Sequence, residues 1–344
     1  MPCGVNVYWN ESTEMTPALQ LEILDLRHFS AASLRPLLVA EAQVWSERLE
    51  WDYRPSANLL LQYLDSRVLP GYVAVENGKI SGYVFCVYEE HKAVIGDVFA
   101  AAPQNSDLDA THIESKLLEA LIELLQNSPG IDRIESQLLL HPHGKLSVPF
   151  QATGFTIHKR YFMRRNLLAG SAPAPLALPA GIEVRAWRED DFNAAARLIS
   201  ASYSGHLDSH INDQYRSAAG SLRFLHNIVR FPGCGYFDGT SSRVLFRRNS
   251  NDFIGVLLCS RVREDVAHIT QLCVAHEERR QGLGRLLIEN CAANLKAQGF
   301  HALTLTVTAA NENAVALYRH TDFQTAHEFD AMLWEKKGQS NSRR

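Results

Sequence analysis

Residues 272–285 of this 344-residue chain read LCVAHEERRQGLGR. The segment begins as the end of an apolar strand, continues as a short polar loop and ends in a glycine-containing turn that opens a helix. The first amides of a helix have no intrahelical acceptor and carry a partial positive charge, so such a turn favours anions. The two glycines allow a ligand close to the backbone, and Arg279, Arg280 and Arg285 add fixed positive charge. The stretch therefore predicts a site for a pyrophosphate group.

This turn is not one of the common nucleotide loops, because it matches neither G-x-x-x-x-G-K-[ST] nor G-x-G-x-x-G. Taken alone it also has a plainer interpretation, in which Gly282 only starts a helix and the arginines are solvated surface. A second segment further along the chain bears on the choice. Residues 311–323 read NENAVALYRHTDF and follow the next predicted strand, at 302–307.

Together the two segments resemble the motifs of the GNAT superfamily of acyl-CoA-dependent N-acyltransferases. The family motif R/Q-x-x-G-x-G/A resembles Arg279, Gly282 and Gly284. The later motif N-x-x-A-x-x-L-Y-x-x-x-G-F resembles residues 311–323, with Asp322 at the usual glycine. Two motifs in the right order on the right elements make a chance match improbable, and the resemblance covers about residues 182–334.

The resemblance implies acetyl-CoA as co-substrate and a set of residues that would bind it. Backbone groups at the end of the strand would meet the acetyl carbonyl and pantetheine, and the turn would cradle the pyrophosphate. Asn311 would bond the cofactor arm, although it would also serve well as a helix N-cap. The complete predicted set is Leu272, Cys273, Val274, Arg279, Arg280, Gln281, Gly282, Leu283, Gly284, Arg285 and Asn311.

By the same resemblance Tyr318 would be the general acid that protonates the leaving thiolate; otherwise it is an aromatic packed on the sheet. An amine acceptor near pKa ~10.4 must lose a proton before attack, so a base or a water chain is expected. His268, on the strand before the loop, is the predicted base, since histidine titrates near neutrality. Glu264 and Asp265 are alternatives. Ribosomal-protein N-terminal acetyltransferases carry a Glu five residues before the motif Asn, where this chain has Thr306.

The chain divides into two similar blocks of about 150 residues, which is what its length predicts. Each runs from a helix through hairpin strands to a Leu-rich helix, then a strand and a closing strand unit. Asn77-Gly78 marks a hairpin turn in the first block, and the strand after Gly154-Phe155 is expected to close it. The fold class is therefore α+β: two tandem GNAT-like domains, each a mixed, mainly antiparallel sheet flanked by helices. The predicted boundaries are a tail at 1–19, a degenerate domain at 20–166, an Ala/Pro linker at 167–181, the active domain at 182–336 and a tail at 337–344.

The first block resembles a copy that has lost its chemistry. In register, Ala110, Ile113 and Ser115 replace the arginine and glycines of the turn, and residues 105–110 supply acidic groups. Phe150 pairs with Tyr318 and has no proton to give, while His143 falls near Asn311. The block is expected to be structural or to help form the substrate cleft.

Composition limits the partners. The 34 basic and 38 acidic residues give a formal charge of −4, so a nucleic-acid partner is not expected. Six scattered cysteines show neither a C-x-x-C pair nor zinc spacing, so no metal is expected. No signal peptide and no apolar run long enough for a membrane are found, and a cytoplasmic location is predicted.

The resulting prediction is an N-acetyltransferase that transfers an acetyl or short acyl group from acetyl-CoA to a primary amine, by direct attack in a ternary complex. The acceptor is a small molecule or peptide, and the oligomeric state is open. A non-catalytic acyl-CoA sensor or interaction protein is the alternative, as is a tandem acetyltransferase that resembles mycothiol synthase in architecture; a nucleotide-phosphate binder is disfavoured. Polar residues that could form the acceptor pocket are Tyr203, His206, His210, Tyr215, Arg223, His226 and Tyr236.

Overall fold

The computed structural model describes residues 21–101, 109–169, 178–231, 233–250 and 252–336. The predicted tails, 1–19 and 337–344, lie outside these ranges, and so do residues 170–177 of the predicted linker and 105–108 of the acidic segment. We call residues 21–166 the N-terminal unit and residues 182–336 the C-terminal unit. Among the described residues no helix is both long enough and apolar enough to cross a bilayer.

The N-terminal unit follows the predicted order of helix, hairpin, helix and strand. Its turn at Asn77 and Gly78 has φ of 50° and 76°, the left-handed pair that a two-residue hairpin requires. Helix α2, Arg54–Asp65, was not expected from the sequence and begins with a proline in its first turn. The elements are β1 (Leu21–Asp25), α1 (Ala31–Leu49), α2, β2 (Gly71–Glu76), β3 (Lys79–Glu89), β4 (Lys92–Ala100), α3 (Ala110–Asn127), β5 (Arg133–Gln137), α4 (Ser147–Ala152) and β6 (Thr156–Asn166).

The C-terminal unit repeats this order and has the helices α5, α6 and α7 between its first strand, β7, and the strands β8 and β9. Helix α7, Ala218–Arg230, starts at Ser217, whose hydroxyl accepts from the amide of Gly220. Helix α8 ends before Gly299 at φ 88°, as the sequence predicts. The elements are β7 (Ile182–Ala186), α5 (Phe192–Ser202), α6 (Leu207–Ile211), the 3-10 turn η3 (Asp213–Arg216), α7, β8 (Tyr236–Phe237), β9 (Arg243–Arg247), β10 (Phe253–Arg263), β11 (Val266–Val274), α8 (Leu283–Ala297), β12 (Ala302–Thr308), α9 (Glu312–Arg319) and β13 (Gln324–Glu335).

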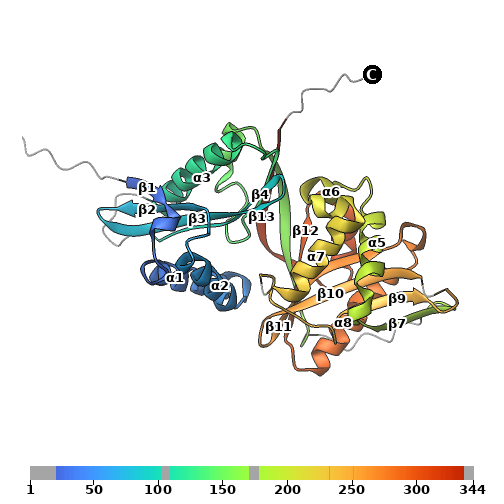
Figure 1. Ribbon diagram of the computed structural model, residues 1–344. Helices are drawn as coiled ribbons and strands as arrows, with labels where there is room; N and C mark the ends of the chain where they lie inside the picture. Colours follow the sequence, from blue (N-terminus) through green and yellow to red (C-terminus); the bar gives the residue numbers. More distant parts are fainter. Residues whose placement is uncertain (1–20, 102–108, 170–177, 232, 251, 337–344) are drawn as a thin grey trace, which may run out of the picture.

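One continuous sheet joins the two units, in the order β1-β2-β3-β4-β5-β13-β6-β12-β11-β10-β9-β7. The strands are antiparallel except for the pairs β4–β5 and β11–β12, which are parallel. Figure 1 shows the two halves side by side, with the long strands β13 and β6 running through the middle of the molecule. The predicted α+β class with a mainly antiparallel sheet is confirmed.

The closing strands of the two units are exchanged. β6 lies between β12 and β13, and β13 lies between β5 and β6. The prediction that β6 closes the first block on its own is therefore wrong, because β13 of the C-terminal unit separates β6 from β5. Asp330 on β13 reinforces the exchange, since its carboxylate accepts from His143 Nδ1 at 2.5 Å and from the amide of Gly144 at 2.7 Å.

The hydrophobic core also crosses between the units. Trp51, which follows α1, and Phe162 on β6 belong to the same buried cluster as Val266 on β11 and Ala302 on β12. Burying apolar surface across this boundary stabilises the two halves against each other. The N-terminal unit is thus part of the structure that supports the C-terminal site.

Candidate active site

The candidate site begins where β11 and β12 separate. The two parallel strands pair at four positions, from Val266↔Ala302 to Ile269↔Leu305, yet β11 continues to Val274 and β12 to Thr308. A register shift opposite Leu258 and Cys259 of β10 leaves one extra residue on β11 at this point. Beyond it, no described strand pairs with the edge of β11 that faces β12, so the peptide groups on this edge are not committed to a sheet partner.

Leu272, Cys273 and Val274 all lie on this unpaired stretch. The carbonyl of Leu272 accepts from the Tyr203 hydroxyl at 3.4 Å, and the Cys273 side chain is buried. Burial raises the pKa of the Cys273 thiol to about 12, so this group stays protonated and is no nucleophile. The structure therefore brings together the three residues that the resemblance assigns to the acyl group.

The glycine turn that follows is shaped as an anion site. Arg280 and Gly282 take φ of 64° and 79°, and the first bond of α8 runs from the amide of Leu286 to the carbonyl of Gly282. The amides before Leu286 thus lack an intrahelical acceptor. A Cβ built on Gly282 would meet nothing within 4 Å, which leaves the approach to these amides open.

Side chains around the turn divide into two groups. Arg279 donates through Nη2 to the Ser202 carbonyl at 2.7 Å and through Nε to the Val274 carbonyl at 3.2 Å, so it fixes the loop on α5. Gln281 likewise donates to Glu278, at 3.1 Å. In the described part of the chain, Arg280 and Arg285 have no carboxylate within ion-pair distance, and these two arginines are the free positive charges of the turn.

Two of the predicted cofactor-binding residues also serve packing. Leu283 is buried in the core of the C-terminal unit. A Cβ on Gly284 would approach Leu317 Cδ2 to 3.1 Å, so glycine at this position lets α8 pack closely on α9. Any contact of these two residues with a ligand would come from their backbone.

Asn311 and Tyr318 lie at the two ends of α9. Asn311 is the N-cap, with Oδ1 accepting from the amide of Ala314 at 3.3 Å, and its Nδ2 lies 3.5 Å from His206 Nε2. The Tyr318 ring packs edge-on against Phe323 with centroids 5.9 Å apart. Its hydroxyl has no hydrogen-bond partner within the described residues. Burial raises the pKa of Tyr318, Asp208 raises it further, and Arg160 opposes the shift.

His268 lies below this site, inside the core that joins the units. Its Nδ1 is 2.9 Å from the Thr304 hydroxyl, and its ring contacts Trp51 and Phe162 with centroids 5.0 and 6.1 Å away. Burial, with a smaller effect of Arg160, lowers its pKa to about 3. The ring therefore stays neutral at physiological pH but is too weak a base for an ammonium group, and the geometry does not favour it as the predicted base.

The alternative bases lie at the far end of β11. Glu264 and Asp265 form the β10–β11 hairpin, and Asp265 is paired with Arg263 at 2.7 Å and with His301 at 2.9 Å. The strand β11 has nine residues, from Val266 next to this hairpin to Val274 at its other end. At a rise of about 3.3 Å per residue the separation is roughly 25 Å, too far for proton transfer at the strand's other end.

A different pair of polar residues lies beside the place where β11 and β12 separate, which we call the strand splay. His206 caps the short helix α6, with Nδ1 accepting from the amide of Asp208 at 3.1 Å, and it also approaches the Asp208 carboxylate at 3.5 Å. The Thr308 hydroxyl, at the end of β12, donates to that carboxylate at 2.5 Å. The sequence placed His206 among seven unranked acceptor residues and did not single out Asp208. No linear motif joins them, because their partners lie about 100 residues further along the chain.

The exchanged strand β6 brings a cation to the same place. Arg160 lies opposite Thr308 in the sheet, and its charge lowers the pKa values of Tyr215 and Tyr318 while burial raises them. In the described ranges it has no acidic partner, and its Nε is buried without a hydrogen bond. The sequence missed this contribution because Arg160 belongs to the other unit.

The equivalent region of the N-terminal unit is filled. Strands β4 and β5 pair over the same four positions as β11 and β12, which puts Asp97 where the other unit has Gln271. Asp97 is buried beside Glu41, whose carboxylate accepts from the Tyr83 hydroxyl at 2.6 Å. Phe150 occupies the position of Tyr318 and packs on Phe155 with centroids 5.1 Å apart. The N-terminal unit thus keeps the framework but has a buried acidic cluster beside the strands and a phenylalanine at the position of Tyr318.

These features define an α+β protein of two related units, one of which keeps an open strand splay above a glycine turn. Residues 209–323 match the family model described as acetyltransferase (GNAT) family. The chain is 33% identical over 81 residues to ribosomal protein bS18-alanine N-acetyltransferase of Escherichia coli (strain K12), which covers 24% of this chain and 55% of that protein. It spans about half the length of the curated relatives it matches.

Two solved structures show that the likeness extends over both units. The GCN5-related N-acetyltransferase from Sphaerobacter thermophilus superimposes with a TM-score of 0.65 at 14% identity, over 92% of this chain and 96% of that chain. A tandem GNAT protein from the clavulanic acid biosynthesis pathway gives a TM-score of 0.58 at 13% identity, over 93% and 100%. At these identities the likeness concerns the fold, which is that of a tandem GNAT protein.

Proposed function

We propose that the C-terminal unit is an N-acetyltransferase that transfers an acetyl group from acetyl-CoA to a primary amine by direct attack in a ternary complex. One observation carries the proposal: the hydroxyl of Tyr318, which has no hydrogen-bond partner among the described residues, lies near enough to Tyr203 to affect its pKa, and Tyr203 reaches the Leu272 carbonyl where β11 separates from β12. The GNAT family match and the N-acetyltransferase relatives support it.

The residues present fit acetyl-CoA. The free amides before Leu286, with Arg280 and Arg285, suit a pyrophosphate, and the open edge of β11 suits the pantetheine and acetyl groups. Asn311 is committed to its capping bond through Oδ1, so its Nδ2 is the group left for the cofactor arm. When bound, acetyl-CoA supplies an activated thioester.

Residues of this chain accept the proton of the amine and donate a proton to the leaving thiolate. Deprotonating an ammonium group of pKa ~10.4 at pH 7 costs about 5 kcal/mol. A group at the site must therefore accept that proton. We assign this role to the His206–Asp208 pair, which lies beside the splay and contacts both Asn311 and Thr308. Tyr318, held protonated by its raised pKa, is the donor on the thiol side, where Arg160 moderates the effect of burial.

The alternatives differ in what they turn over or bind. A non-catalytic acyl-CoA sensor would bind acetyl-CoA without releasing thiol, and the free Tyr318 hydroxyl favours the enzyme instead. An acetyltransferase that resembles mycothiol synthase shares the tandem architecture, but no residue of this chain points to that substrate. A cytoplasmic location is also part of the proposal, consistent with free thiols at Cys86, Cys234, Cys259, Cys273 and Cys291.

The test is thiol release from acetyl-CoA by the full chain with a panel of primary amines. The panel contains polyamines, amino acids, aminoglycosides and a peptide beginning with alanine, because the E. coli relative is named for an alanine acceptor. Amine-dependent release well above the amine-free rate supports the enzyme. Tight CoA binding with no release for any amine identifies the sensor, and stabilisation by ATP but not CoA in a thermal-shift assay contradicts both.

A further inference from the structure

A short segment connects the candidate site to the N-terminal unit. Residues 203–217, which we call the acceptor segment, contain α6 and η3 and lead from α5 to α7. On the side of the site, Tyr203 reaches the Leu272 carbonyl, and Tyr215 stacks on Tyr203 with centroids 4.5 Å apart. His206 and Asp208 belong to the same segment. Whatever holds this segment also sets the position of the proposed proton acceptor.

Bonds from outside the segment help to hold it, beside an internal one from Arg216 Nε to the Ser209 carbonyl at 2.8 Å. Helix α6 has five residues, and helices of this length are not stable without outside contacts. Arg133 on β5 provides them, because its Nη2 donates to the carbonyls of His210 at 2.6 Å and Ile211 at 3.2 Å. These carbonyls belong to the last turn, where intrahelical donors are missing and positive charge is favoured. Arg133 is itself only 4% exposed.

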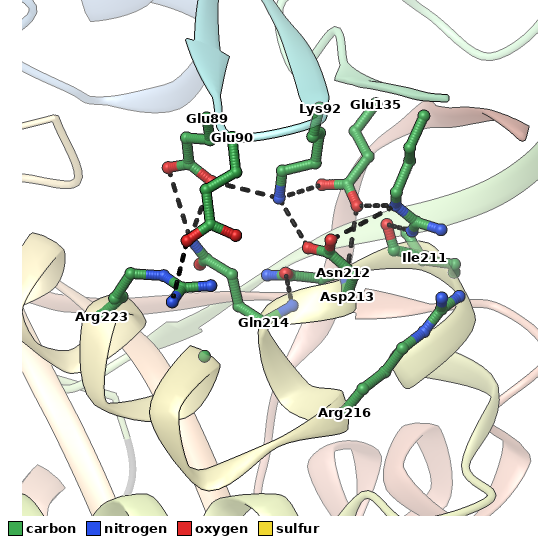
Figure 2. Close-up of polar contacts among 12 residues, drawn as sticks. Glu89, Glu90, Lys92, Glu135, Ile211, Asn212, Asp213, Gln214, Arg216 and Arg223 are labelled. Atoms are coloured by element: carbon green, nitrogen blue, oxygen red, sulfur yellow. Dashed lines mark hydrogen bonds and ion pairs between the residues drawn. The ribbon is translucent and has the colours of Figure 1, made fainter. Parts of the chain in front are cut away.

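Lys92 on β4 holds the following turn. Its Nζ donates to Asp213 Oδ1 at 2.6 Å and to Glu135 Oε2 at 3.3 Å, and it lies 3.2 Å from Glu89. Glu135 in turn accepts from the amide of Asp213 at 3.3 Å. Figure 2 shows the Lys92 side chain pointing from the N-terminal unit between Glu135 and Asp213, with Glu89 and Gln214 beside it.

The network of hydrogen bonds and ion pairs includes residues of both units. Arg133 Nε bonds Glu135 at 2.5 Å and Nη1 bonds Glu335 on the exchanged strand β13. Glu335 Oε1 also accepts hydrogen bonds from Nη1 and Nη2 of Arg216 in η3, both at 3.2 Å. Directional bonds from the buried side chains of Arg133, Lys92 and Glu135 permit fewer arrangements than apolar contact would. The network therefore selects one position for the acceptor segment relative to the sheet.

We propose that Arg133 and Lys92 are positioning residues: the N-terminal unit holds the acceptor segment so that His206 and Asp208 face Asn311 and Thr308. The catalytic consequence rests on the function proposed above, while the placement of the segment does not. By this proposal the N-terminal unit contributes to catalysis in the C-terminal unit. Arg133 does so without touching the reacting groups.

The first experiment is hydrogen exchange on the full chain, comparing Arg133→Met and Lys92→Met with wild type. The amides of residues 207–216 should exchange at least tenfold faster, while those of α8 keep their wild-type rates. The matched control is Arg27→Met, which removes an exposed arginine paired with Asp25 in the same unit. Unchanged exchange at 207–216, or an equal increase throughout the C-terminal unit, would overturn the proposal.

A second readout separates positioning from mere stability. The ring resonances of His206, assigned by subtraction with His206→Gln, should shift in Arg133→Met and return toward wild type in Arg133→Lys, which keeps the charge. Resonances that do not move in any variant overturn the positioning role, even if the segment exchanges faster. Should Arg133→Met not fold, Asp213→Asn makes the same test from the half-exposed side of the network, with the same two outcomes.

Kinetics completes the test with the panel amine that wild type acetylates fastest. Arg133→Met should raise KM for that amine about tenfold and leave KM for acetyl-CoA unchanged, whereas Arg133→Lys should bring KM for the amine back toward the wild-type value. Equal changes in both constants contradict the proposal. Exchange and histidine spectra need no turnover, so an inactive wild-type protein would count against the proposed function while these readouts still decide whether the segment is held by Arg133 and Lys92.

Discussion

The hydroxyl of Thr308 donates to the carboxylate of Asp208 at 2.5 Å, joining the end of β12 to the short helix α6. Thr308 comes from the strand that leads into the Asn311 motif, whereas Asp208 lies 100 residues earlier in the acceptor segment. The bond brings an ionisable carboxylate and its neighbour His206 to the mouth of the strand splay. The proposed division of labour follows from it, with Asp208 and His206 on the amine side and Tyr318 on the thiol side.

Asp208→Asn should lower kcat/KM for the amine at least tenfold, because the amide keeps the bond with Thr308 but loses the charge beside His206. Affinity for CoA, measured by calorimetry, should stay within twofold of wild type. Thr308→Val is the matched variant, since it removes the bond and leaves the charge. If Thr308→Val is the more damaging of the two, the carboxylate serves structure and not proton transfer.

Tyr318→Phe should lower kcat by about 10²-fold or more with CoA affinity nearly unchanged, because only the proton donor is lost and the ring still packs on Phe323. Thiol release and calorimetry measure the two quantities. Tyr63→Phe, on the exposed face of α2, should leave both unchanged. A kcat within threefold of wild type in Tyr318→Phe would contradict the assignment of Tyr318 as the proton donor.

Gly282→Ala should weaken CoA binding about tenfold, because its Cβ would project into the open approach to the helix amides. Holding alanine at φ 79° also costs roughly 1 kcal/mol of folding free energy. Gly299→Ala is the control, since Gly299 has φ 88°, equally open space and a place at the opposite end of α8. Both variants should melt at similar temperatures. A matching loss of CoA affinity in Gly299→Ala would show that backbone strain, and not the blocked approach to the amides, weakens CoA binding.

Glu41→Gln should make the protein less sensitive to rising pH. Burial raises the pKa of Glu41 from 4.5 to about 7, so the folded state binds the extra proton between these pH values. The free energy of unfolding therefore falls as pH rises through that window. Denaturant melts should show Glu41→Gln more stable than wild type at pH 8 but not at pH 4. Exposed Glu47→Gln should follow wild type at both, and a parallel pH profile for Glu41→Gln would contradict the assigned cause.

Separate expression of residues 1–168 and 169–344 should yield no independently folded half. Both neighbours of β6 and the outer neighbour of β5 come from the C-terminal unit, so each fragment would expose long unpaired strand edges. The two fragments produced together should co-purify with native circular dichroism. A monomeric, cooperatively melting fragment 1–168 would show that the exchange is dispensable for folding.

The local features of this protein were predictable from its sequence because they depend on neighbouring residues. Residues 272–285 predicted the strand, turn and helix in the order observed, and Asn77-Gly78 predicted its hairpin turn, since φ preferences and helix ends are properties of a few consecutive residues. The pairing of Phe150 with Tyr318 also followed from alignment of the two halves, and the two ring pairs with Phe155 and Phe323 agree with it.

The relations between distant segments were decided by the tertiary structure. Strand exchange between β6 and β13 leaves no local signal, because either strand has the period that suits both positions in the sheet. The exchange places Arg160 at the site of the other unit, and burial between the units turns His268 from a promising base into a weak one with a pKa of about 3. Sequence alone thus determined the motifs and the repeated fold; packing across the two units determined which titratable groups meet at the site, because proximity and desolvation exist only once the chain is folded.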